Sequence, residues 1–283
     1  MVDINTDMTT PTPLGVYLRR VVQRPRAWAL SYLVTTLLAL GLALLTAMAL
    51  LPFTRYPAFA RLLETRSLDW LLDFSMLEID GGSVPFGIPV LLALPVWILA
   101  RLIWTWLEGG TLAEYAAAQT LSWRAFAKAG WQWLGVFLAL NLIGAILVVV
   151  IGGVTLLLAI AAYLLAPALG WAIGVAGLAV AGLVATWIEV SRAAAVTQNQ
   201  RGVFHALGNA ARALFRQAAP LMALVIGGLA LYGLLFLAHR GLMDTLPLHW
   251  WLPTLLVQQA YTLLRLGIRL ARQAGQVGLL SNA

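Results

Sequence analysis

Residues 131–151 have the sequence WQWLGVFLALNLIGAILVVVI, an apolar stretch without a single charged side chain. A helix needs about 20 consecutive apolar residues to cross the ~30 Å hydrocarbon core of a bilayer. Five more blocks have a comparable length and character, and they occupy residues 27–53, 86–107, 169–188, 219–238 and 250–267. The sequence therefore predicts an all-α fold, a polytopic transmembrane bundle of six spans.

The composition of the whole chain supports this interpretation. Of its 283 residues, 61% are hydrophobic and 10% are charged, whereas soluble domains average about 45–50% apolar and about 25% charged residues. Too few polar side chains remain to cover a soluble core, which excludes a soluble enzyme, a disordered chain and a nucleic-acid-binding domain. The net charge of +7 does not reopen the last class, because the basic residues fall between apolar blocks.

The segments around the spans complete the predicted organisation. Residues 1–13 are predicted to be a disordered tail, and residues 14–283 a single transmembrane domain. Amphipathic helices on the membrane surface are predicted over about 57–78, 112–130 and 201–216. The apolar stretch 154–167 has three alternative interpretations. It extends span three, re-enters the membrane, or crosses the membrane as a seventh span.

The distribution of basic residues predicts the orientation, because cytoplasmic loops of membrane proteins are enriched in Lys and Arg. Six spans with both termini in the cytoplasm leave only Arg55, Arg61, Arg66 and Arg240 outside. The cytoplasmic side then holds Arg19, Arg20, Arg24, Arg26, Arg101, Arg124, Lys128, Arg192, Arg201, Arg212, Arg216, Arg265, Arg269 and Arg272. A seventh span would even out this split, so the six-span topology is favoured.

A weak internal repeat accompanies the spans. Trp106-Leu107-Glu108 ends the second span, and Trp187-Ile188-Glu189 ends the fourth span 81 residues later. The same offset aligns Phe126 with Leu207. We expect two parallel repeats, each a descending span, a surface helix and an ascending span, with Glu108 and Glu189 at matching depths at the cytoplasmic rim. A chance match is the alternative.

Two of the predicted surface helices have a basic stripe opposite an apolar one. In 112–130 the basic stripe contains Arg124 and Lys128, and the apolar face includes Trp123, Phe126 and Gly130. In 201–216 the basic stripe is Arg201, His205, Arg212 and Arg216, and the apolar face is Phe204, Leu207, Ala211, Leu214 and Phe215. This pattern predicts that these residues bind anionic lipid headgroups on the inner leaflet. Docking onto an acidic partner protein is the alternative.

The search for chemistry predicts no catalytic, cofactor-binding or metal-binding residues. The chain has no cysteine, and of its three histidines His239 and His249 lie across one short outer loop. A shared metal or haem is conceivable there, but interfacial hydrogen bonding is the default. Glu189 has Arg192 three residues further on, a spacing that favours an ion pair within one helix. The small residues of 170–182 predict close helix packing.

One part of the sequence resembles known proteins. The segment Trp-Leu-Glu-Gly-Gly-Thr-Leu at 106–112, followed by Ser-Trp-Arg-Ala-Phe at 122–126, resembles bacterial six-span membrane proteins. These are similar to the membrane domain of glycerophosphoryl diester phosphodiesterases. The resemblance covers about residues 86–240. It implies a helical domain of the bacterial cytoplasmic membrane without catalysis, because the phosphodiesterase activity belongs to a separate soluble domain.

The sequence as a whole predicts a non-enzymatic membrane protein, either a subunit or scaffold or a lipid-associated accessory module. Its expected partners are membrane lipids and another membrane protein or a second copy of the chain, with no nucleic acid and no cofactor. The alternative is a small-solute transporter or permease built from the two parallel repeats. Apart from Arg101 in the span 86–107, no charged residue lies near the centre of a predicted span, which weakens that alternative.

Overall fold

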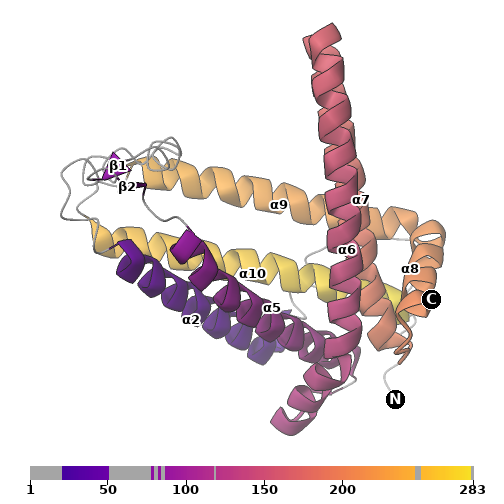
Figure 1. Cartoon of the computed structure of the whole chain (residues 1–283). Coiled ribbons are helices and arrows are strands. Elements are labelled where there is room, and N and C mark those ends of the chain that lie inside the picture. Colours follow the sequence, from indigo (N-terminus) through magenta and orange to yellow (C-terminus); the bar gives the residue numbers. More distant parts are fainter. Residues whose placement is uncertain are drawn as a thin grey trace. The chain divides into compact units, whose positions relative to one another are not determined.

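The structure, a computed structural model, describes residues 21–50, 78–79, 82–83, 87–117, 119–245 and 250–281 (Figure 1). The predicted tail 1–13 and the predicted surface helix over 57–78, apart from its last residue, lie outside the described residues. The helices are α2 (Pro25–Leu50), α5 (Gly87–Ala116), α6 (Trp123–Leu165), α7 (Pro167–Thr197), α8 (Val203–Arg216), α9 (Ala218–Thr245) and α10 (Trp251–Ser281). Strand β1 (Glu78–Ile79) pairs antiparallel with β2 (Gly82–Ser83). The predicted helical fold is confirmed.

The chain divides into two compact units. One is Leu33–Trp104, which contains both short strands, and the other combines Met1–Tyr32 with Thr105–Ala283. The second unit contains all the side chains of the candidate site.

Helices α6 and α7 form a tight antiparallel pair. Ser122 caps the start of α6, because its hydroxyl accepts a hydrogen bond from the backbone N–H of Ala125 (3.3 Å). Only Ala166 separates the two helices, and its extended backbone (φ −156°, ψ 120°) is the conformation favoured before a proline. Pro167 then occupies the first turn of α7, where its missing N–H costs nothing.

The structure resolves the helical state of the stretch 154–167. Residues up to Leu165 continue α6 without a break, as the first of the three alternatives predicted. The pair Gly152-Gly153 does not end the helix, because a glycine inside a helix costs only about 1 kcal/mol relative to alanine. The chain turns at Ala166 instead.

Burial along α6 and α7 changes abruptly. In the first turns of α6 the side chains of Phe126, Trp133, Phe137 and Leu140 are buried. Beyond Gly144, Ala162 alone on α6 is buried, and in α7 burial is sparse until Thr186. The uncovered apolar surface therefore runs over about 145–165 and 167–185, further along α6 than the predicted span 131–151.

The packed core lies where the end of α5, the starts of α6 and α9, the ends of α7 and α10, and α8 meet. Its fully buried members include Phe137, Val190, Ala194, Ala210 and Ala271. The five long helices each bury one end there, and α8 buries one face. Among them, α6, α7 and α9 are long and apolar enough to span a membrane, within the residues that the structure describes.

The prediction of a separate surface helix over 112–130 is wrong. Residues 112–116 are the last turns of α5, and residues 123–130 are the first turns of the continuous helix α6. The physical reason is that the apolar side of 123–130 has a protein partner. Phe126 is completely buried, with its ring 6.1 Å from that of Trp106. A helix is present over most of the range 201–216, as α8; its location at the membrane surface stays a prediction.

Close helix packing within 170–182 is confirmed at two of its glycines. A Cβ atom on Gly170 would lie 2.7 Å from Tyr163 Cβ, and one on Gly177 would lie 2.0 Å from Thr155 Cγ2. A Cβ atom on Gly174 would meet nothing within 4 Å. The close contacts with α6 therefore recur at seven residues, two helical turns, rather than at the four of the Gly-x-x-x-Gly spacing.

Candidate functional site

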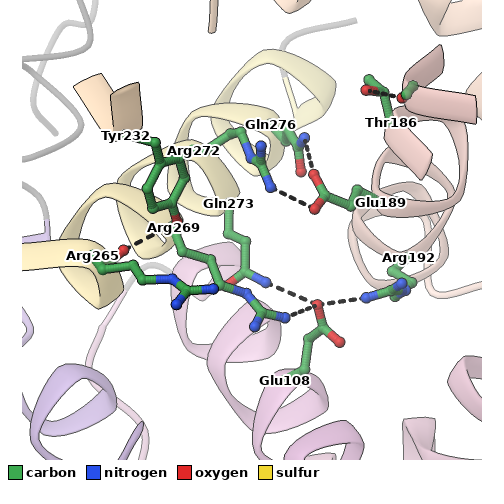
Figure 2. Close-up of polar contacts among 11 residues, drawn as sticks. Glu108, Thr186, Glu189, Arg192, Tyr232, Arg265, Arg269, Arg272, Gln273 and Gln276 are labelled. Atoms are coloured by element: carbon green, nitrogen blue, oxygen red, sulfur yellow. Dashed lines mark hydrogen bonds and ion pairs between the residues drawn. The ribbon is translucent and has the colours of Figure 1, made fainter. Parts of the chain in front are cut away.

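Glu108, near the end of α5, is the centre of a buried polar cluster (Figure 2). Its side chain is 5% exposed. The carboxylate oxygen Oε1 accepts hydrogen bonds from Arg192 Nη1 on α7 (2.6 Å) and from Gln273 Nε2 on α10 (2.9 Å). Arg269 Nη2 on α10 lies 3.4 Å from the same oxygen. The buried charge of Glu108 is thus neutralised by two other helices.

Glu189 on α7 has a similar but more exposed environment. Its Oε1 accepts a hydrogen bond from Arg272 Nη2 (2.5 Å), and its Oε2 accepts one from Gln276 Nε2 (3.5 Å). The side chain of Glu189 is 24% exposed and that of Arg272 is 14% exposed. Both donors belong to α10, so α10 contacts both glutamates.

The donors on α10 follow one spacing. Arg269 and Gln273 serve Glu108, whereas Arg272 and Gln276 serve Glu189. Residues four apart lie on the same face of a helix, so each Arg-x-x-x-Gln pair presents two donors to one carboxylate. The two pairs interleave within the segment RLARQAGQ at 269–276.

The prediction of an ion pair between Glu189 and Arg192 within α7 is wrong. Arg192 pairs with Glu108 on α5, and Glu189 pairs with Arg272 on α10. The spacing of three residues permits a pair between Glu189 and Arg192, but an exposed helical pair is worth only about 0.3–0.5 kcal/mol. A buried carboxylate such as Glu108 needs a cation far more, because an uncompensated charge there is strongly destabilising.

The charges of this region do not cancel. Three arginines, Arg192, Arg269 and Arg272, face two carboxylates. The Nε atoms of Arg192 and Arg272 are buried without a hydrogen-bond partner in the structure. The arrangement carries more positive than negative charge, and its ion pairs and hydrogen bonds connect α5, α7 and α10.

The two Trp-x-Glu segments make corresponding contacts. The ring of Trp106 packs edge-on against Phe126, and Trp187 Nε1 donates a hydrogen bond to the backbone oxygen of Leu207 (3.0 Å). Phe126 and Leu207 are the residues that the offset of 81 aligns. Thr105 and Thr186, one residue before each tryptophan, are both buried and share the same offset. Neither threonine was among the residues predicted from the sequence.

The basic residues predicted to bind lipid headgroups are all exposed, but they lie on two different helices. Arg201, His205, Arg212 and Arg216 are at or on α8. Arg124 and Lys128 are on the first turns of α6 and not on a surface helix. Part of the predicted apolar face of α8 has a protein partner, because Leu207 packs into the core with Ala206 and Ala210.

A second buried carboxylate, Glu114, lies in the last turns of α5. The residue is 1% exposed, and both carboxylate oxygens are buried without a hydrogen-bond partner in the structure. Burial raises the pKa of Glu114, and the charges of Arg26 and Arg24 oppose this rise. Burial likewise raises the pKa of the neighbouring Tyr115 phenol.

The two arginines near Glu114 bind main-chain oxygens rather than its carboxylate. Arg24 donates hydrogen bonds to the backbone oxygens of Glu114 and Ala117, the latter at 3.0 Å. Arg26 donates to the backbone oxygen of Leu121 (2.5 Å). Cations at a helix C-terminus complement the helix dipole, so these contacts fix the start of α2 to the end of α5.

The predicted histidine pair is only half described, because His249 lies outside the described residues. The ring of His239 lies 4.3 Å from that of Tyr261 on α10, at a tilt of 32°. This contact joins α9 to α10.

Comparisons with protein-family models, with curated proteins and with solved structures find no match for this chain.

Proposed function

We propose that this protein is a multi-pass integral membrane module without enzymatic activity, acting as a subunit, scaffold or lipid-associated accessory protein. The observation that carries the proposal is the uncovered apolar surface of the α6–α7 pair. Leu157, Leu164, Leu165 and Leu178 are 71%, 82%, 85% and 76% exposed. Burying apolar surface is worth about 25 cal/mol per Å², so a bilayer is the solvent that this surface fits.

The burial pattern supports a revised third span. The uncovered segments of α6 and α7, about 145–165 and 167–185, are each close to the ~20 residues that cross a bilayer. They are joined by Ala166 alone, so both would reach the same side of the membrane. We propose the third span over this part of α6, with its first turns packed in the core on the cytoplasmic side.

The six-span topology, the cytoplasmic termini, the bacterial inner membrane and the parallel repeat belong to the same proposal. The matched contacts of Trp106 and Trp187 support the repeat. The resemblance to phosphodiesterase membrane domains supports a non-catalytic role. The transporter alternative has less support, since Glu108 and Glu189 both already accept hydrogen bonds from arginine and glutamine side chains.

Reporter fusions test the topology. Reporters placed after Ala118, Ala210 and Ala283 should all give cytoplasmic signals, and a reporter between Gly81 and Gly82 should give an external one. An external signal at Ala210 together with a cytoplasmic one at Ala118 would contradict the six-span topology, because it requires an odd number of crossings between them instead of two.

Two further experiments separate the module from the transporter. A complex of fixed stoichiometry, purified through a tag on the full chain and stable on dilution, supports the module. Solute uptake by vesicles that contain only this chain supports the transporter. The Arg272→Gln variant is an informative control, because loss of uptake without loss of folding would connect the arginines to a transported anion.

A further inference from the structure

Helix α8 has one face in the core and a second face that no other part of the described chain covers. Ala206, Leu207 and Ala210 are buried on the first face. On the second face, Phe204 is 81% exposed and Phe215 is 88% exposed. Two phenyl rings with this exposure are an unusual surface for a helix in contact with water alone.

The exposed rings lie next to the basic stripe. At about 100° per residue, Phe204, Gly208 and Phe215 fall within about 40° of one another on the helix. The adjoining ~60° on the same wheel contains the basic residues His205, Arg212 and Arg216, and Arg201 directly precedes the cap of the helix at Gly202. Helix α8 has no acidic residue. Its outward surface is therefore half aromatic and half cationic.

Two contacts fix α8 at a defined level of α7. Trp187 Nε1 donates to the backbone oxygen of Leu207, beside the point where the uncovered apolar part of α7 ends. Asn209 Nδ2 donates to Gln200 Oε1 (2.9 Å), and also to Gln198 Oε1. These amides border the turn at Asn199, whose left-handed backbone (φ 50°) ends α7. The helix thus lies beside the edge of the proposed membrane segment.

We propose that the outward face of α8 inserts Phe204 and Phe215 into the acyl boundary of an anionic leaflet. Arg201, Arg212 and Arg216 hold the phosphate groups of its lipids there. Guanidinium groups bind phosphate oxygens through paired charge-assisted hydrogen bonds, and aromatic side chains favour the interface of the membrane. This proposal rests on the proposed membrane location and specifies the lipid class that α8 contacts.

The absence of cysteine from the sequence allows a single-site test on the full chain. A Cβ atom at Gly208 would meet nothing within 4 Å, so Gly208→Cys carries a spin label between the two rings without removing either. The labelled protein is placed in nanodiscs of phosphatidylcholine alone or with half phosphatidylglycerol. Collisions with oxygen and with a water-soluble nickel chelate then report whether the label is in lipid or in water.

The label at position 208 is expected to be in lipid in the anionic discs. In the neutral discs it is expected to shift toward water. Each arginine near an anionic surface is worth about fivefold in binding, so Arg212→Gln/Arg216→Gln should lower the ratio of lipid-exposed to water-exposed label roughly 25-fold. The matched variant Arg212→Lys/Arg216→Lys, which keeps both charges, should largely retain it. Equal accessibility in the two lipids overturns the proposal, and label in water in both would favour an acidic protein partner.

A second label separates this proposal from the membrane location. Leu157→Cys on α6 should be in lipid in both kinds of disc, because Leu157 is 71% exposed in the uncovered apolar segment. Water exposure at this position would contradict the membrane location itself. In the anionic discs, lipid exposure at position 157 together with water exposure at 208 would overturn the α8 proposal alone.

Discussion

Replacing Glu108 by glutamine tests the role of the buried cluster most directly. The change keeps the shape of the side chain but removes the negative charge that faces Arg192 and Arg269. Arg192 is only 10% exposed and its Nη1 lies 2.6 Å from the carboxylate. Breaking one partner of a buried ion pair costs about 3–5 kcal/mol, because the remaining charge stays buried without compensation. We expect Glu108→Gln to lower the free energy of unfolding by about 3 kcal/mol, the lower end of that range, since the amide oxygen still accepts a hydrogen bond.

The molecule supplies a matched control for this measurement. Arg240 and Asp244 form an ion pair of 3.8 Å on the surface of α9, with side chains 70% and 73% exposed. Exposed pairs contribute about 0.2–1 kcal/mol, so Arg240→Gln should change the stability by less than about 1 kcal/mol. Glu189→Gln should fall between the two, because Glu189 is 24% exposed.

The unfolding equilibrium can be followed by tryptophan fluorescence while sodium dodecyl sulfate is titrated into mixed micelles, since the chain has 12 tryptophans. A double-mutant cycle of Glu108→Gln with Arg192→Gln isolates their interaction, for which we expect about 1–3 kcal/mol. If Glu108→Gln unfolds with the same free energy as Arg240→Gln, the cluster does not hold α5, α7 and α10 together and this reasoning is wrong.

Three other outcomes are expected. Arg272→Gln should destabilise the protein more than Arg269→Gln in the same titration, because Glu108 keeps two closer donors whereas Glu189 loses its only cation among the described residues. Gly130→Ala should lower the free energy of unfolding by about 1–3 kcal/mol, because the new Cβ would lie 2.7 Å from the indole nitrogen and the backbone oxygen of Trp106. Gly135→Ala, whose Cβ would meet nothing within 4 Å, should be neutral or stabilising. The pKa of Glu114 is raised in the folded state, so its charged form opposes folding. The stability of Glu114→Gln in thermal unfolding, relative to the unsubstituted protein, should therefore grow as the pH rises above 4.5, the ordinary pKa of this carboxyl group. A pH-independent difference would contradict this last expectation.

Sequence periodicity located the helices because the signal is local. The apolar blocks predicted α7, α9 and the middle of α6, and the amphipathic pattern of 201–216 predicted α8. The same signal failed at 112–130, because an apolar helix face has the same pattern whether lipid or protein covers it. Phe126 is covered by Trp106 of α5, a contact that the wheel of one helix cannot reveal.

The partners of the rim carboxylates were beyond the reach of sequence reasoning for a related reason. Arg192 has a glutamate three residues away in sequence, yet it pairs with Glu108, 84 residues away. Arg269 and Arg272 contributed only to the count of cytoplasmic charges. One signal was available, the doubled Arg-x-x-x-Gln spacing in 269–276, which places donors on a helix in pairs. Without knowledge that α10 lies against α7, this spacing has no predicted partner.

The geometry of α10 bears on the repeat more sharply than the sparse sequence identity does. The two donor pairs are offset by three residues, which on a helix is about 4.5 Å along the axis and about 60° around it. Glu108 and Glu189 are therefore bound by adjacent stripes of α10 at nearly the same level along that helix. A parallel repeat requires this, since equivalent residues then lie at equal depth, whereas an inverted repeat turns one unit over and would place such residues far apart along a shared helix. The contacts of both glutamates with α10 are thus the arrangement that the proposed parallel repeat predicts.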